Sequence, residues 1–214
     1  MSTFISILEK RRLAPPLLYG ISDRKGSPSC SNVLEYLRIL FRTRAHILQW
    51  REKDLTAEEQ RGLVRAGADL ARQTGKLFLV NTWVKIALKE RADGAHLPSS
   101  QSLIEACKLR SAAGHEDDFV LGKSVHSARE ALEAEREGAD YLLLGPVFDP
   151  ISKESVVPPL GLSGLRETAQ MLSLPVIALG GVEETTLARI LSTSVVGAAG
   201  ISWMQREVEQ LTGR

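Results

Sequence analysis

Short apolar runs alternate with longer amphipathic stretches along almost the whole chain. Eight runs have little polar alternation and are expected to be strands, at residues 17–21, 46–50, 77–80, 94–97, 119–122, 141–144, 176–179 and 195–199. Continuous apolar runs of this length are typical of strands that are buried on both faces of a parallel sheet.

The stretches between these runs carry apolar residues every three or four positions, which is the spacing of an amphipathic helix. Helices are expected at residues 32–42, 56–73, 83–89, 103–113, 127–137, 164–171 and 185–191, and from residue 202 onward. Thr56 and Glu59 have the spacing of a capping box, and Ser127 is placed to cap the helix that turns Ala131 and Ala134 inward.

Eight such alternations predict an α/β fold in which the strands close into a single (β/α)8 TIM barrel. The alternative is an open doubly wound sheet, which usually has fewer strands. We expect residues 1–16 to be a basic leader, with a helix across the barrel bottom as one option, and residues 17–214 to form the barrel. The loop at residues 148–160 is long enough to be a lid.

The composition excludes several classes of protein. A formal charge of +1 argues against a dedicated binder of nucleic acid or of a membrane surface. The apolar runs are far shorter than the roughly 20 residues of a membrane span. Cys30 and Cys107 have no metal-ligand spacing and are too few for a disulfide framework, so a cytoplasmic location is expected.

Glycines end the last two expected strands. Gly180 and Gly181 follow the seventh strand, and Gly200 follows the eighth, directly before Ile201 and Ser202. Glycines at such turns let backbone N–H groups approach a ligand, and each following helix directs its positive end there. Two turns of this kind in succession predict a phosphate site, although tight strand-to-helix turns alone would also explain the glycines.

Polar residues gather at or after the other expected strand ends, which share one mouth in a barrel. The candidates for substrate binding are Gln49, Arg51, Lys53, Asn81, His96, Ser124 and Ser152, and the candidates for catalysis are His126 and Lys153. Cations, amides and hydroxyls suit an anionic, phosphorylated small molecule. The set contains no close pair of acids for a glycosidase and no cluster of histidine and cysteine for a transition metal. We expect neither a metal nor a cofactor.

Each candidate also has a structural alternative. Arg51 and Lys53 would be solvated in a loop of mixed charge, and Lys153 would be solvated on a lid. His126 could simply precede a helix at the surface, and His96 could be a hydrogen-bonded core residue. Asn81 could cap the next helix.

Several motifs in this order resemble the thiamine-phosphate synthase superfamily. They are Gln49-Trp-Arg-Glu-Lys53, a strand ending in Asn81, Asp93-Gly-Ala-His-Leu97, Gly145-Pro-Val-Phe148 with Lys153 five residues on, Pro158-Pro-Leu-Gly161 and Ala178-Leu-Gly-Gly181. The resemblance runs from residue 17 to residue 202 and implies a (β/α)8 barrel.

The resemblance implies one of two reactions. Thiamine-phosphate synthases join a pyrimidine pyrophosphate to a thiazole phosphate with Mg²⁺, whereas TenI-like thiazole tautomerases move a proton on a thiazole phosphate carboxylate. The synthase pattern has aspartates where this chain has Thr82 and the carboxylate-free stretch at residues 98–101, which ends at Gln101. The stretch at residues 122–127 resembles the tautomerase version, in which the histidine matching His126 is the acid/base residue.

The expected function is therefore thiazole tautomerase, an isomerase without a cofactor. The alternative is a thiamine-phosphate synthase, a transferase that would need Mg²⁺, because Gln49, Arg51, Lys53, Ser124 and Lys153 match synthase positions. A second alternative is a non-catalytic binder or regulator that keeps the phosphate site. A phosphorylated thiazole is the expected ligand, and the resemblance also suggests a homodimer.

Overall fold

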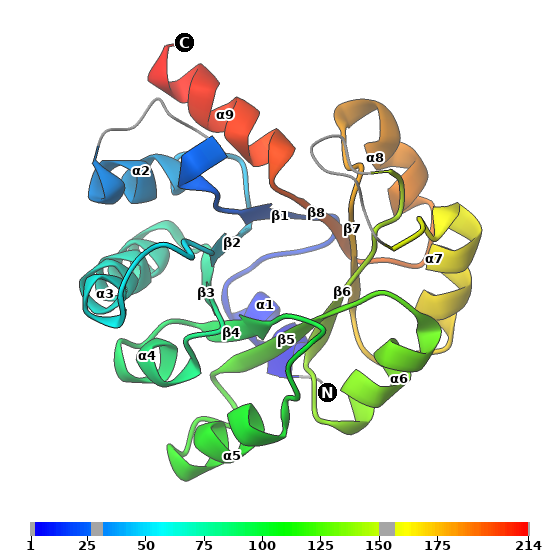
Figure 1. Ribbon diagram of the computed structural model, residues 1–214, viewed down its shortest axis with the longest axis horizontal. Coiled ribbons are helices and arrows are strands. Elements are labelled where there is room, and N and C mark those ends of the chain that lie inside the picture. Colours follow the sequence, from blue (N-terminus) through cyan, green and yellow to red (C-terminus); the bar gives the residue numbers. More distant parts are fainter. Residues whose placement is uncertain (1–2, 27–31, 150–156, 214) are drawn as a thin grey trace.

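The computed structural model describes residues 3–26, 32–149 and 157–213 (Figure 1). Its strands are β1 (Leu17–Ile21), β2 (Ile47–Trp50), β3 (Leu77–Asn81), β4 (Gly94–Leu97), β5 (Val120–Val125), β6 (Tyr141–Leu144), β7 (Val176–Leu179) and β8 (Gly197–Gly200). All neighbouring strands are parallel and follow chain order, and β8 pairs with β1 to close the barrel. The predicted (β/α)8 barrel is confirmed, and the open sheet is excluded.

Helices surround the ring of strands, except that the first helix lies behind the strands, under the barrel (Figure 1). They are α1 (Thr3–Lys10), α2 (Val33–Leu40), α3 (Ala57–Thr74), α4 (Val84–Lys89), α5 (Ile104–Ala112), α6 (Ala128–Arg136), α7 (Gly161–Gln170), α8 (Glu184–Leu191) and α9 (Ser202–Thr212), with a short 3-10 helix at Arg24–Gly26. The expected capping box of Thr56 and Glu59 begins α3, and Ser127 accepts a hydrogen bond from the N–H of Glu130 at the start of α6.

Two expected boundaries were wrong for tertiary reasons. β5 continues to Val125 instead of ending at residue 122, so Ser124 lies inside the strand and pairs in register with Leu143. The polar side chain of Lys123 is accommodated there by Glu137, at 2.9 Å. α7 begins at Gly161 rather than at residue 164, because the N–H groups of Leu160 and Gly161 already bond to the chain after β6.

The core has two layers, one between the strands and the helices and one inside the barrel. The inner layer includes the fully buried Tyr19, Ile47 and Tyr141, together with Phe4 from α1. The ring of Phe4 stacks on that of Tyr141 with 4.7 Å between centroids. Helix α1 therefore closes the bottom of the barrel with apolar side chains and leaves the opposite mouth to polar residues.

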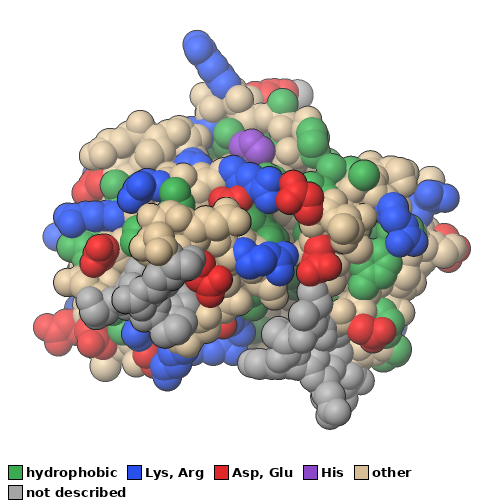
Figure 2. All heavy atoms as spheres, turned by 90° about the horizontal axis from the view of Figure 1, so that it is seen from above, with side chains coloured by type: hydrophobic (Ala, Val, Ile, Leu, Met, Phe, Trp, Pro, Cys, Tyr) green, Lys and Arg blue, Asp and Glu red, His purple; other side chains and the backbone are tan. Residues whose placement is uncertain are grey.

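The outer surface carries both signs of charge. Figure 2 shows lysine and arginine side chains interspersed with aspartate and glutamate on the side of the barrel that lies at the top of Figure 1. Across the residues that the structure describes, no helix is long and apolar enough to span a membrane.

Candidate active site at the barrel mouth

A cavity of about 480 Å³ lies at the carboxyl ends of the strands. Its lining is Ile21, Gln49, Arg51, Lys53, Asn81, Thr82, Trp83, His96, Pro98, Ser99, Ser124, His126, Leu143, Leu179 and Ile201. A neighbouring cavity of about 450 Å³ between α4 and α5 shares Thr82 and Trp83, but most of its other lining residues are apolar. The polar groups therefore converge in the first cavity, where active sites of (β/α)8 enzymes lie.

Seven of the candidates for substrate binding and catalysis meet in this cavity, and they are Gln49, Arg51, Lys53, Asn81, His96, Ser124 and His126. The strand order explains this, because the residues come from the ends of β2 to β5, which are consecutive neighbours in the barrel. Ser152 and Lys153, and with them most of the expected lid, lie outside the described residues.

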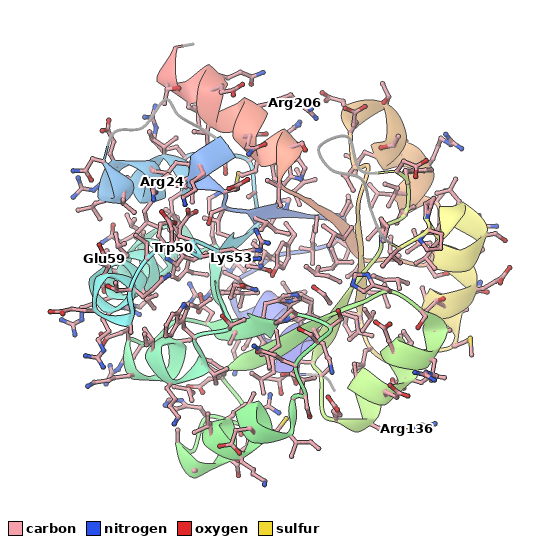
Figure 3. The ribbon with its side chains drawn as sticks, in the orientation of Figure 1. Arg24, Trp50, Lys53, Glu59, Arg136 and Arg206 are labelled. Atoms are coloured by element: carbon pink, nitrogen blue, oxygen red, sulfur yellow. The ribbon has the colours of Figure 1, made fainter. Side chains whose placement is uncertain are left out.

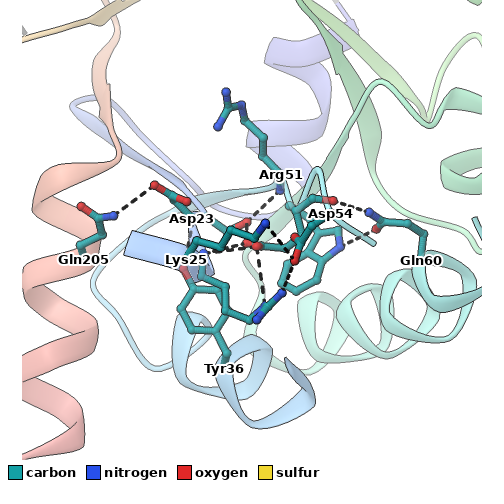
Figure 4. A network of polar contacts seen from close by, with 11 residues as sticks. Asp23, Lys25, Tyr36, Arg51, Asp54, Gln60 and Gln205 are labelled. Carbon is teal, nitrogen blue, oxygen red and sulfur yellow. Dashed lines mark hydrogen bonds and ion pairs between the residues drawn. The ribbon is translucent and has the colours of Figure 1, made fainter. Parts of the chain in front are cut away.

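The end of β2 is held by a hydrogen-bond network that fixes the backbone of Arg51 (Figure 4). The N–H of Arg51 donates to Ser22 Oγ over 2.8 Å, and that hydroxyl donates to the buried carboxylate of Glu52 over 2.7 Å. Burial raises the pKa of Glu52, although the Ser22 hydroxyl and Arg24 counteract it.

The two cations after β2 extend from this network toward the mouth. The Arg51 guanidinium extends away from the network in Figure 4 and pairs with no carboxylate among the described side chains. Lys53 lies near the centre of the ring of strands in Figure 3, whereas Glu59, Arg136 and Arg206 lie among the outer helices. The Arg51 side chain is partly buried and lines the cavity.

His96 belongs to the barrel interior and is 1% exposed. Its Nδ1 lies 2.9 Å from the Tyr141 hydroxyl and its Nε2 lies 2.8 Å from Ser124 Oγ. Burial, with the positive charge of Arg51 as a smaller cause, lowers the pKa of His96 to about 3. His96 is therefore a neutral imidazole that borders the cavity, with both nitrogens already hydrogen-bonded.

His126 lies at the rim, one residue beyond β5, and is half-buried. Its backbone N–H donates to Glu130 over 2.9 Å, and its Nδ1 bonds to the carbonyl oxygen of Gly145. Because a carbonyl only accepts, Nδ1 carries the proton of the neutral ring, and Nε2 keeps its lone pair. In the part of the chain that the structure describes, Nε2 has no hydrogen-bond partner.

Asn81 does not cap the next helix. Its amide donates to the carbonyl of His96 over 3.3 Å, while Trp83 stands at the N-cap of α4 without a side-chain bond. Trp83 is 37% exposed and lines the cavity. An exposed indole beside the mouth offers a flat apolar surface to a ligand.

The two glycine turns differ in what they offer to an anion. Gly180 and Gly181 adopt φ angles of 98° and 63°, and a Cβ on Gly181 would come within 2.5 Å of the Phe148 Cβ. Turn geometry and packing therefore require both glycines. Helix α8 begins after Glu183 and carries Glu184 in its first turn, so negative charge already complements its positive end.

The turn after β8 is more open to a phosphate. Helix α9 has neither an acidic residue in its first turn nor a side-chain cap, among the residues described. Its first N–H groups, next to Ser202, are therefore free to bind an anion. Ile201 lines the cavity beside them, and Gly200 gives the close approach, since a Cβ there would lie 2.7 Å from the Trp203 ring.

Comparison with known proteins places this geometry in a family. The sequence model of the family described as thiamine monophosphate synthase, TMP-TENI, matches residues 18–204. The chain belongs to this family. It is 36% identical to the thiamine-phosphate synthase of Chlorobium phaeovibrioides over 191 residues, which cover 89% of this chain and 87% of that protein.

Two further comparisons agree. The thiamine-phosphate synthase of Pelotomaculum thermopropionicum is 32% identical, with 92% of each chain covered. The solved thiamine phosphate pyrophosphorylase of Pyrococcus furiosus superposes with a TM-score of 0.74 at 29% identity and covers 92% of this chain and 95% of its own. The chain is thus a thiamine-biosynthesis enzyme of the thiamine monophosphate synthase family, and the names of these relatives favour the synthase over the tautomerase.

The resemblance implies Mg²⁺ for the synthases of this family, and the donor set here does not suit that ion. Mg²⁺ is usually held by one or two carboxylates together with substrate phosphates. The cavity lining contains hydroxyls, amides, imidazoles and cations, and no carboxylate, from the residues that are described. Nor do the described ranges contain a group of three histidine, cysteine or acidic residues suited to a metal.

The sequence did not single out several residues of this site. Tyr19 and Tyr141 connect His96 to Gln49 beneath the cavity, and Ile21, Leu143 and Trp83 supply apolar lining. Tyr19 and Tyr141 stand in apolar runs and were counted as core. A hydroxyl inside an otherwise apolar strand was the available signal, because a buried phenol needs a partner.

Proposed function

We propose that this protein is a thiazole tautomerase, which moves a proton between two carbons of a thiazole phosphate carboxylate. The observation that carries the proposal is His126, which lines the cavity with Nδ1 bonded to the Gly145 carbonyl and Nε2 available as a base. Proton transfer needs one group at the reacting carbon that can both accept and return a proton.

The other residues of the mouth have binding roles in this reaction. The phosphate is bound by N–H groups at the turn after β8, with Gly200, Ile201 and Ser202, and by the turn at Gly180 and Gly181. Arg51 and Lys53 attract the ring carboxylate and stabilise the negative charge that builds up during proton removal. We also propose Lys153 as a catalytic group and Ser152 as a substrate contact, from the family resemblance alone.

The chemical step is a transfer of one proton. A C–H bond of the non-aromatic ring breaks, the proton passes to His126 Nε2, and the electron pair enters the ring system. The imidazolium then returns the proton to a second carbon, which leaves an aromatic thiazole and a neutral histidine. The bond from Nδ1 to the Gly145 carbonyl keeps the ring in one orientation during both transfers.

The second candidate is the synthase reaction, and the names of the relatives favour it. Gln49, Arg51, Lys53 and Ser124 line the cavity and match the positions that the synthase resemblance assigns to substrate. The absence of carboxylates from the described lining opposes it. A binder or regulator without turnover is the remaining alternative, and a homodimer also stays a prediction.

One paired assay separates these functions. The purified protein is given the non-aromatic thiazole phosphate carboxylate alone, or pyrimidine pyrophosphate with thiazole phosphate and excess Mg²⁺, with the Chlorobium phaeovibrioides relative in parallel. We expect catalysed tautomerisation and no measurable coupling. Coupling at about 1 per second or faster would replace the tautomerase by the synthase, and binding without either turnover would indicate a regulator.

A further inference from the structure

Five side chains form a hydrogen-bond chain that passes beneath the cavity floor. Gln49 Oε1 lies 2.7 Å from the Tyr19 hydroxyl, which lies 3.0 Å from the Tyr141 hydroxyl. The Tyr141 hydroxyl lies 2.9 Å from His96 Nδ1, and His96 Nε2 lies 2.8 Å from Ser124 Oγ. The two tyrosines are fully buried, whereas Gln49, His96 and Ser124 line the cavity.

The direction of every bond in this chain follows from its first member. Gln49 Oε1 only accepts, so the single proton of the Tyr19 hydroxyl is donated to it. The Tyr19 oxygen then accepts from Tyr141, and the Tyr141 oxygen accepts from His96 Nδ1–H. His96 Nε2 is left with a lone pair, which accepts the hydroxyl proton of Ser124.

Burial keeps all members of the chain neutral. It raises the pKa of Tyr19 and of Tyr141, and it lowers the pKa of His96 to about 3. The phenols stay protonated and the imidazole stays uncharged at ordinary pH, so the order of donors and acceptors does not change with pH near neutrality. A neutral, fully satisfied buried network also avoids the cost of an unpaired polar group.

The packing holds the two phenols at the centre of the barrel. Tyr141 stands opposite Gly122 in register, and a Cβ on Gly122 would come within 2.1 Å of the tyrosine ring. Phe4 stacks on the same ring from below. Gly122 therefore makes room for a large aromatic ring at this position in the interior.

We propose that Tyr19 and Tyr141 are positioning residues that fix which atoms Gln49 and Ser124 present to the ligand. Gln49 has its oxygen engaged and offers only its amide N–H groups, whereas Ser124 has its proton engaged and offers only oxygen lone pairs. A ligand group that lies against Gln49 is then a hydrogen-bond acceptor, and one that lies against Ser124 is a donor. This pattern follows from the direction of the chain and does not depend on the proposed function.

Imidazole ¹⁵N NMR of the ligand-free protein tests the direction. We expect His96 to be the Nδ1–H tautomer, assigned by the loss of its signals in His96→Gln. His46 is an internal reference of the opposite tautomer, because its Nδ1 accepts a bond of 2.9 Å from the N–H of Leu18. In Tyr141→Phe, the His96 signals should shift toward the Nε2–H tautomer, because the Nδ1 acceptor is gone.

Tyr36→Phe is the matched control. Tyr36 is equally buried, and its hydroxyl accepts a bond of 3.1 Å from the N–H of Asp23, outside the chain of five. The control should leave the His96 tautomer unchanged. An Nε2–H tautomer in the wild type, or an Nδ1–H tautomer that persists in Tyr141→Phe, would overturn the proposal. If Tyr141→Phe does not fold, Tyr19→Phe serves, because Tyr141 then loses its acceptor and turns its proton to His96.

A pair of small probes tests the consequence for binding by NMR titration. 2-Aminothiazole offers an acceptor and a donor, whereas 2-methoxythiazole has lost the donor. The wild type and Tyr36→Phe should prefer the amine by about tenfold, and Tyr141→Phe should prefer it by less than threefold. An equal preference in the wild type and Tyr141→Phe would overturn the assigned role of the tyrosines. If the wild type shows both expected NMR results but no tautomerase activity, only the proposed function is contradicted.

Discussion

The floor and the rim of the cavity each contain one histidine, in opposite settings. His96 lies in the floor at 1% exposure, and both of its nitrogens are bonded to side chains of the interior. His126 lies at the rim, half-buried, and only its Nδ1 is bonded, to a main-chain carbonyl. The same side chain is a fixed structural element in one place and the proposed base in the other.

The difference shows what makes a histidine usable for proton transfer. Burial lowers the pKa of His96 to about 3, so it cannot hold a proton near neutrality. His126 has one nitrogen fixed by an acceptor, which orients the ring, and one nitrogen that faces no described partner. Orientation without full engagement is the arrangement of a general base.

The largest expected effect comes from removing the rim base. His126→Asn keeps polarity and approximate size but cannot carry a proton, so tautomerisation should fall about a hundredfold or more. Binding of the aromatic product should change little, because the phosphate and carboxylate contacts remain. Steady-state kinetics and calorimetry measure the two quantities.

His96→Asn tests the floor histidine in the same two assays. Its imidazole is already bonded at both nitrogens, so its loss should change binding more than proton transfer. A variant of His126 that keeps wild-type turnover would mean that the rim histidine only precedes α6. The proton carrier would then have to be sought elsewhere in the cavity.

The second effect concerns stability. Here the loss of His96 should matter more than the loss of His126. His96→Leu leaves the hydroxyls of Tyr141 and Ser124 without their partner, and each unsatisfied buried group costs about 1–3 kcal/mol. Since Ser124 borders the cavity and can bond to water, we expect the free energy of unfolding to fall by about 2 kcal/mol. His126→Leu should cost less, about 1 kcal/mol, because it leaves only one group, the carbonyl of the buried Gly145, without its donor. Urea unfolding of both variants measures this difference. Equal losses in the free energy of unfolding would contradict the contrast between the floor and the rim.

The fold followed from the sequence because parallel barrel strands are apolar on both faces. The end of β5 was missed because Lys123 and Ser124 look like the start of a loop. They are strand residues because Glu137 and His96, which are distant in sequence, supply their partners. Polar strand ends of this kind depend on tertiary contacts that a local pattern does not contain.

The residues that line the cavity could be predicted from the sequence, but the hydrogen bonds that connect them could not. The mouth residues could be gathered because the strand ends of a barrel share one face. The link between Tyr19 and Tyr141 joins β1 to β6, strands that are not neighbours in the barrel. Such a contact depends on the tilt of the strands and on which side chains meet inside, so the two tyrosines could only be counted as core.

The last expected effect is the pH dependence that the floor histidine gives to stability. The folded pKa of His96 is about 3, whereas an unfolded histidine has a pKa near 6.5. Between these values the unfolded chain binds the proton and the folded chain does not, so acid favours unfolding. The contribution of neutral His96 is complete above about pH 6.5 and is lost as the pH falls toward 3, by at most about 1.4 kcal/mol per pH unit.

His96→Gln should remove this slope while keeping hydrogen-bonding capacity in the floor. Burial also raises the pKa of Glu52, Asp93 and Asp140, which opposes the histidine because protonation of these carboxyls favours the folded state. Their contributions are common to both proteins and cancel in the difference. Urea unfolding of the wild type and His96→Gln at pH 4.5 and pH 7 should therefore show a stability difference that moves in favour of the variant at the lower pH. A difference that is constant across this range would mean that the floor histidine is not held neutral, and the distinction between floor and rim would be lost.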